Sequence, residues 1–195
     1  DHLADMDLLK EAFALPVWGS EYTSRSVDSD RILVDGEVLQ LGKQAWQILI
    51  TPGHHPGHTC FLSDAGLVAG DMLAGFGTIL IPPGTGDMDE YLEQLARLRD
   101  LKPHLAFPSH GPVIALPKKK FNYYIKHRSA RHDKVLQAVI DGLTSVSEIA
   151  VKAYEDTPDA HPGLARDQTL AHLLSHQRQG KLSQDSHGNW HASID

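Results

Sequence analysis

Three short apolar segments of this chain each run directly into a side chain that can bind a metal ion, with glycine or proline beside it. These junctions are Thr51-Pro52-Gly53-His54, Gly70-Asp71 and Pro108-Ser109-His110-Gly111. The ends of β-strands are rigid, and glycine and proline let the backbone turn sharply, so three such side chains can be aimed at one point. Imidazole and carboxylate together suit zinc, with iron or manganese as alternatives. The pattern predicts a metal site that includes His54, Asp71 and His110.

Two further histidines, His55 and His58, lie close to the first junction. We expect them to support the ligands or to pack beside them rather than to bind the metal themselves. The chain has no serine in a nucleophile-elbow motif, and Cys60 lies away from every predicted ligand. Covalent catalysis by a side chain is therefore disfavoured.

Composition excludes several classes of protein. The chain has 195 residues, 41% of them hydrophobic, which suits one sizeable domain or one domain with a small appendage. Asp and Glu outnumber Lys and Arg by 25 to 18, so nucleic-acid binding would need a local basic patch. The single cysteine excludes an internal disulfide framework, and no apolar stretch reaches membrane-spanning length. We expect a soluble, cytoplasmic protein with no membrane partner.

Hydrophobic periodicity and turn residues predict an alternation of strands and helices. The predicted helices cover residues 3–13, 87–98, 117–141, 145–154 and 162–179. The predicted strands lie at residues 17–18, 46–50 and 105–107, with hairpins at 31–41, 59–69 and 181–191. In the first hairpin, Asp35-Gly36 is expected to form the turn, because this pair accepts a positive φ. In the last helix, the side chains expected to face inward are Leu164, Leu170, Leu173 and Leu174.

The order helix, helix, helix, hairpin at the end of the chain is that of a small winged-helix unit. We place one domain at residues 1–130 and a winged-helix-like domain at 131–195. The helix at 162–179 offers only Arg166 and Arg178, offset in part by Asp167, whereas a reader of duplex DNA ordinarily has more positive charge. We expect this tail to be structural or to form a homodimer, and to wall the cleft of the site.

The three metal-ligand motifs, in this order and at this spacing, resemble those of the metallo-β-lactamase superfamily. Residues 75–91 and 124–128 resemble one branch of it, the β-lactamase-like hydrolases with a C-terminal winged-helix-like domain. The resemblance therefore covers essentially the whole chain. It implies an α/β fold of the metallo-β-lactamase αββα sandwich type, followed by a small C-terminal winged-helix-like domain.

The first metal motif of that superfamily is His-x-His-x-Asp-His at a turn from a strand into a helix. Asp1-His2 matches only its last two residues. By this resemblance Asp1, His2 and His110 would hold one metal, His54 would belong to the other, and Asp71 would bridge both. The two leading histidines are absent from this sequence. We therefore expect an N-terminally incomplete fold whose partner is the missing N-terminal segment of the same protein.

The resemblance implies hydrolysis by a water or hydroxide that bridges two divalent metal ions, zinc first, with iron or manganese as alternatives. Asp1 would be the catalytic residue that orients this nucleophile and accepts its proton. Two substrate classes stay open, a phosphodiester of single-stranded RNA and a small-molecule ester or thioester, because a fold does not determine a substrate. The alternative is a non-catalytic module that binds nucleic acid or protein through the winged-helix-like tail.

Overall fold

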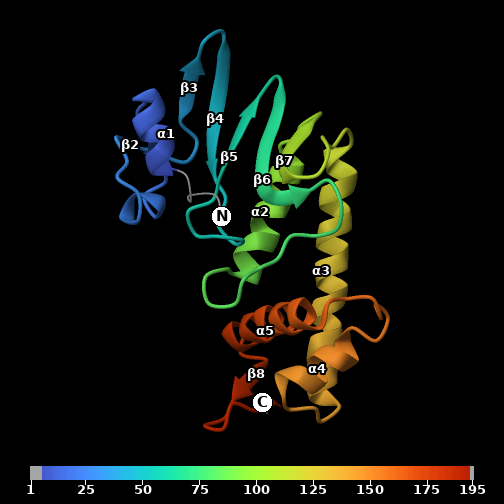
Figure 1. Cartoon of the computed structure of the whole chain (residues 1–195). Helices are drawn as coiled ribbons and strands as arrows, with labels where there is room; N and C mark the ends of the chain where they lie inside the picture. Colours follow the sequence, from blue (N-terminus) through green and yellow to red (C-terminus); the bar gives the residue numbers. More distant parts are fainter. Residues whose placement is uncertain (1–5, 194–195) are drawn as a thin grey trace.

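A computed structural model describes residues 6–193 of the chain (Figure 1). Its centre is a five-stranded mixed sheet in the order β3-β4-β5-β6-β7. The strands are β3 (Val38–Leu41), β4 (Gln44–Ile50), β5 (Thr59–Ser63), β6 (Gly66–Ala74) and β7 (Ala106–His110). Neighbouring strands pair antiparallel from β3 to β6, whereas β6 and β7 pair parallel. The predicted α/β class is confirmed, and so is the hairpin that joins β5 to β6.

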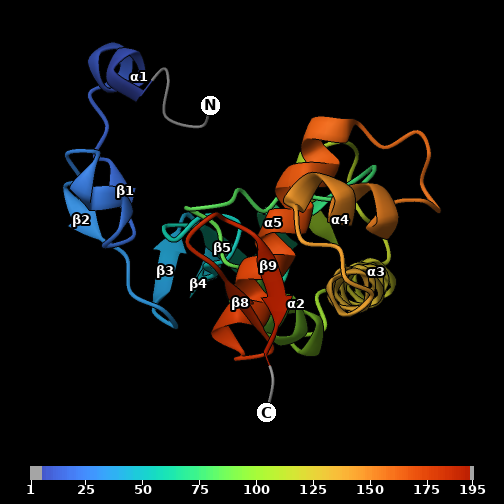
Figure 2. The same ribbon diagram turned by 90° about the horizontal axis from the view of Figure 1, so that it is seen from below.

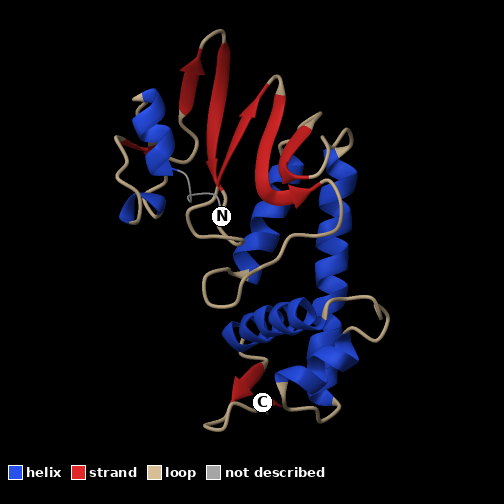
Figure 3. Cartoon of the chain, in the orientation of Figure 1, coloured by secondary structure: helices blue, strands red, loops and turns tan. Residues whose placement is uncertain are grey.

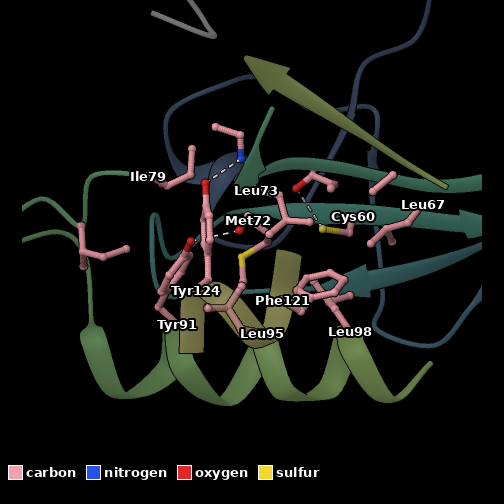
Figure 4. Close-up of a cluster of buried hydrophobic side chains, with 14 of the residues drawn as sticks. Cys60, Leu67, Met72, Leu73, Ile79, Tyr91, Leu95, Leu98, Phe121 and Tyr124 are labelled. Carbon is pink, nitrogen blue, oxygen red and sulfur yellow. Dashed lines mark hydrogen bonds between the residues drawn. The ribbon is translucent and has the colours of Figure 1, made fainter. Parts of the chain in front are cut away.

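Two helices, α2 (Met88–Asp100) and α3 (Pro117–Ile140), pack against the central strands (Figure 3). Figure 4 shows Tyr91, Leu95 and Leu98 rising from α2 toward the sheet. These three side chains recur at helical spacing, so they form one apolar stripe that is fully buried. The helix begins at Asp87, whose carboxylate accepts the backbone N–H groups of Asp89 and Glu90. This capping fixes where the loop before α2 ends.

Both faces of the sheet carry buried apolar side chains. Ile48 and Leu49 are consecutive in β4 and therefore point to opposite faces, yet they are 0% and 1% exposed. Leu49 belongs to the cluster beneath α2 and α3, whereas Ile48 packs with Leu33 and Leu39 on the other face. The cluster with α2 and α3 is the larger one.

The predicted hairpin at residues 31–41 is wrong. Its first half contains β2 (Arg31–Ile32), which pairs parallel with β1 (Trp18–Gly19), while β3 pairs with β4 instead. The Asp35 carboxylate accepts the Ile50 N–H at 2.8 Å and binds Arg97, so the Asp35-Gly36 turn directs the chain toward the end of β4. The tight hairpin turn lies at Gly42, with φ +61°. Figure 2 shows the β1–β2 pair to one side of the sheet.

The N-terminal helix α1 (Met6–Phe13) agrees with the predicted helix over the described residues, and the short 3₁₀ helix η1 (Thr23–Arg25) follows β1. After α3 come α4 (Val146–Ala153), α5 (Pro162–Arg178) and the antiparallel pair β8 (Leu182–Gln184) and β9 (Trp190–Ala192). This is the predicted order of elements, whereas membership of the winged-helix class stays a prediction. Between residues 6 and 193 no helix is both long and apolar enough to cross a membrane.

Helix α3 connects the two halves of the molecule without a break (Figure 1). Phe121 and Tyr124 belong to the apolar cluster beneath the sheet, and Val135 and Ala138 belong to a second cluster with α4 and α5. The boundary placed between residues 130 and 131 therefore falls inside a continuous helix, and the division into two domains stays a prediction.

The expected inward face of α5 is partly wrong. Leu173 is fully buried, but Leu164 is 52% exposed. Helix α5 contacts α2, α3, α4 and β8, so most of its circumference is covered and polar side chains are enclosed as well. The buried polar residues on this helix are Gln168, Thr169, His172, Ser175 and His176.

Candidate metal centre

The structure brings together the three ligands predicted at the strand ends. His54 lies in the loop after β4, Asp71 within β6 and His110 at the end of β7. The Nε2 atom of His54 lies 3.5 Å from Oδ2 of Asp71, and the Nε2 atom of His110 lies 3.3 Å from Oδ1. The Asp71 side chain is 5% exposed, so both imidazoles meet it at the edge of the core. Asp1 and His2 lie outside the described residues.

The ring of His54 is oriented by the loop between β6 and α2. Its Nδ1 atom lies 2.7 Å from the backbone oxygen of Leu80. A carbonyl can only accept a hydrogen bond, so Nδ1 carries the proton and, in the neutral ring, Nε2 presents its lone pair to Asp71. Metal-binding histidines are typically fixed in this way, with the second ring nitrogen bound to a carbonyl or carboxylate.

Gly53 lets the loop that carries His54 approach α2. Its φ is +129°, and a Cβ atom there would stand 2.4 Å from the backbone of Tyr91. The Asp87 N–H also donates to the Gly53 oxygen at 2.7 Å. Glycine is required here because no L side chain fits both the conformation and the space.

Asp71 is held in place through its own backbone by His58. The Asp71 N–H donates to Nε2 of His58 at 2.9 Å, which places the ring proton on Nδ1, and Nδ1 then donates to the buried Thr51 hydroxyl at 2.7 Å. His58 therefore supports Asp71, one of the predicted ligands. His55 accepts the Gly57 N–H at 3.1 Å, and burial lowers its pKa, with the neighbouring His54 as the second cause.

Two buried tyrosines hold β6 in place beside Asp71, a role that no sequence motif indicates. Tyr91 donates its hydroxyl to the Met72 oxygen at 2.9 Å, and Tyr124 accepts the Ala74 N–H at 3.0 Å (Figure 4). Burial raises the pKa of both phenols, so the hydroxyls stay protonated. Burial also raises the pKa of Cys60 to about 12, which keeps its thiol neutral and unreactive.

The donors brought together here, two imidazole nitrogens and one carboxylate, are of the chemical type that zinc and iron prefer. Over residues 6–193, no three or more His, Cys, Asp or Glu side chains form a group that could hold a metal ion by themselves. His54, Asp71 and His110 fit a metal in donor type but do not form such a group on their own. The further donors that the sequence predicted, Asp1 and His2, lie outside the described part.

Similarity to known proteins covers the same motifs. A family model described as "Metallo-beta-lactamase superfamily" matches residues 1–110. The chain is 33% identical over 141 residues to a beta-lactamase-like protein 2 homolog of Drosophila melanogaster, covering 70% of this chain and 47% of that protein. It is 31% identical over 113 residues to an atrochrysone carboxyl ACP thioesterase of Aspergillus fumigatus, covering 57% of this chain and 35% of that protein. The chain thus spans less than half the length of these relatives.

Solved structures share the fold. A metallo-beta-lactamase family protein of Thermus thermophilus superposes with a TM-score of 0.70 at 25% identity, covering 83% of this chain and 54% of that one. A protein solved in a di-iron-bound form superposes with a TM-score of 0.50 at 26% identity, covering 61% of this chain and 69% of that one.

Proposed function

Because the chain belongs to the metallo-beta-lactamase superfamily, we propose that it catalyses metal-dependent hydrolysis with His54, Asp71 and His110 as metal ligands. The observation that supports this most directly is the placement of the Asp71 carboxylate between the two imidazoles, at 3.5 and 3.3 Å. Two ligand atoms on one tetrahedral ion, each bonded at about 2.1 Å, lie roughly 3.4 Å apart. A carboxylate with one such partner on each oxygen suits a bridge between two ions.

Zinc is the first candidate for these ions, and iron is the second because one structural relative was solved in a di-iron-bound form. Bound there, two divalent ions would supply an acidified water near neutral pH and positive charge at the attacked centre. The Leu80 carbonyl fixes the tautomer of His54 before a metal binds, and β6 holds Asp71 in place. Asp1 and His2 complete the proposed set, with Asp1 orienting the nucleophile and accepting its proton.

A thioester is the proposed substrate class. The relative from Aspergillus fumigatus is named a thioesterase. The loop at residues 75–87, which follows the strand carrying Asp71, contains no Lys, Arg or His to pair with a phosphate. The nearby Lys120 ammonium instead donates to the backbone oxygens of Gly75 and Gly77 at 3.3 and 3.5 Å. In the proposed reaction water adds to the carbonyl carbon, the C–S bond breaks, and an acid and a thiol leave.

The rival function, a non-catalytic module that acts through the tail, finds less support. Arg178, one of the two arginines on α5, binds Asp87 at 2.9 Å and Asp89 at 2.8 Å within the molecule. Its charge is therefore already engaged by carboxylates at the start of α2. A homodimer formed through the tail and a cytoplasmic location stay predictions.

Hydrolysis assays with the full-length protein test the proposal. An acyl thioester and a single-stranded RNA are offered to the native protein, to Asp71→Asn and to Asp64→Asn, a matched change on an exposed turn. We expect thioester cleavage that Asp71→Asn abolishes and Asp64→Asn leaves unchanged. Cleavage of the RNA but not of the thioester would mean that the substrate is a phosphodiester. Retardation of duplex DNA without any hydrolysis would support the binding module instead.

A further inference from the structure

The backbone on either side of Leu80 is held by side chains from two helices. In α3, Tyr124 donates to the Gly77 oxygen at 3.0 Å, and the guanidinium of Arg128 donates to the Ile79 oxygen. In α5, the Gln168 side chain binds both backbone groups of Ile81, accepting its N–H at 3.3 Å and donating to its oxygen at 2.9 Å. Side chains from α3 and α5 thus hold this part of the loop in place.

Arg128 and Gln168 act as one unit. Arg128 is 2% exposed, and one of its nitrogens donates to the Gln168 side-chain oxygen, the same atom that accepts the Ile81 N–H. A buried guanidinium must have hydrogen-bond acceptors, since its desolvation is otherwise very unfavourable. The acceptors it uses here, Gln168 and Ile79, are neutral. The charge therefore serves to order the loop backbone.

Leu80 lies between these two anchored residues. Ile79 and Ile81 are 6% and 0% exposed, with side chains in the apolar cluster beneath the sheet, so the peptide groups on both sides of Leu80 are fixed. Its own carbonyl is the group that accepts the Nδ1 proton of His54 at 2.7 Å. A small displacement of this segment would lengthen that bond and free the imidazole to exchange its proton between the two ring nitrogens.

We propose that Gln168 in α5, together with Arg128 in α3, is a positioning residue for His54. The pair fixes the Leu80 carbonyl, the carbonyl holds the proton on Nδ1, and Nε2 is left facing Asp71. Helix α5 thereby contributes to the candidate metal centre, although Gln168 is 87 residues from Ile81 in the sequence. The value of this arrangement for metal binding rests on the proposed function, whereas the tautomer of His54 does not.

The test uses ¹⁵N NMR of the histidine rings in the full chain without added metal. Imidazole ¹⁵N shifts distinguish a protonated from an unprotonated ring nitrogen, so they report the tautomer directly. Gln168→Met keeps the side-chain volume and removes both hydrogen bonds to Ile81. Gln177→Met makes the same change at an exposed position of α5. Gln168→Glu restores the acceptor for Arg128 and for the Ile81 N–H while removing the donor.

We expect native protein and Gln177→Met to show His54 with its proton on Nδ1 throughout. Gln168→Met should show a mixture of tautomers, and Gln168→Glu should recover most of the native signal. His191, which lies 3.2 Å from Asp185 in the terminal hairpin, should be unchanged in all variants. If Gln168→Met does not fold, Gln168→Glu tests the inference by itself, because loss of its donor should produce a measurable minor tautomer of His54. An unchanged His54 signal in folded Gln168 variants would overturn the inference.

Zinc titration of the same proteins separates this inference from the proposed function. Loss of a partner that orients a metal-binding histidine typically lowers metal affinity by about 10–100-fold. We expect that loss in Gln168→Met and not in Gln177→Met. If no variant binds zinc but the tautomer still changes, the proposed function fails and the positioning of His54 stands. Equal zinc affinity despite a changed tautomer would overturn the link between the tail helix and the metal.

Discussion

The backbone N–H of Asp71 donates to Nε2 of His58 at 2.9 Å. Through this bond a histidine that is not itself among the proposed ligands fixes the strand that carries Asp71, the carboxylate proposed to bridge the metal ions. His58 is fixed in turn by the buried Thr51 hydroxyl. The first and second sequence motifs of the site are therefore connected by a chain of hydrogen bonds before any metal is bound.

Replacing His58 tests this connection. His58→Leu removes the acceptor for the Asp71 N–H, which should cost about 1–3 kcal/mol of unfolding free energy and lower zinc affinity by about 10–100-fold. His58→Gln places an amide oxygen near the position of Nε2 and should recover part of both losses. Urea unfolding and metal titration are the measurements. Equal zinc affinity in native protein and His58→Leu would show that the bond does not support the site.

Gly70 should be far less tolerant of a side chain than Gly77. Both have positive φ, +51° and +64°, so alanine should cost roughly 1–2 kcal/mol at either position from backbone strain alone. At Gly70 a Cβ atom would also stand 2.5 Å from Nε2 of His58, whereas nothing lies within 4 Å at Gly77. Thermal unfolding should therefore show a clearly larger loss for Gly70→Ala. Equal losses would mean that the close approach to His58 adds no cost in stability at Gly70.

Three histidines lie together between α3 and α5. The rings of His132 and His176 stack with centroids 3.5 Å apart, and Nδ1 of His132 lies 3.2 Å from Nδ1 of His172. Burial lowers the pKa of all three, and that of His132 falls from 6.5 to about 4, with the charge of His176 as a further cause. Lys181 also lowers the pKa of His132, whereas the nearby Asp89 raises it.

The unfolding free energy should therefore depend on pH. Because the folded pKa of His132 lies below 6.5, the unfolded state takes up protons first as the pH falls. The stabilisation is complete above pH 6.5 and is lost progressively toward about pH 4. Urea unfolding over this range should show a shallower decline for His132→Phe, which keeps a flat ring against His176 and cannot titrate. The exposed His187→Phe serves as the control and should follow the native curve.

Phe76 should contribute to substrate binding rather than to stability. Its side chain is 78% exposed, and it follows Gly75, whose N–H donates to the His110 oxygen at 2.8 Å. Phe76→Ala should raise KM for a long-chain acyl thioester by roughly 5–30-fold, as expected for 1–2 kcal/mol of lost apolar contact, with kcat little changed. Val151→Ala, at a 77% exposed position on α4, is the matched control. A fall in kcat at unchanged KM would contradict this role.

The convergence of His54, Asp71 and His110 could be anticipated from the sequence because each follows a short apolar run and has glycine or proline beside it. These runs become strands of one sheet, so local patterns indicate this part of the site, although Asp71 lies inside β6 and not at its end. The role of the Asp35-Gly36 turn could not be predicted from the sequence, because the Asp35 carboxylate binds the end of β4 and Arg97, partners that no local pattern reveals.

The role of the tail helix was beyond a sequence-based prediction. The periodicity of α5 favoured its leucines as the inward face, but Gln168 and His172 are buried because α2, α3 and α4 surround the helix. A glutamine that pairs with a backbone 87 residues away leaves no periodic signal in either segment. Local sequence patterns indicate the side chains that converge, but not the tertiary contacts that orient them.

Metal content of the full-length protein, measured by elemental analysis beside Asp71→Ala and Asp64→Ala, tests the central claim most directly. A bridging carboxylate predicts about two zinc or iron ions per chain in the native protein and in Asp64→Ala, and a sharp fall in Asp71→Ala. Absence of stoichiometric metal from the native protein, or equal metal in Asp71→Ala, would contradict a metal centre built on Asp71.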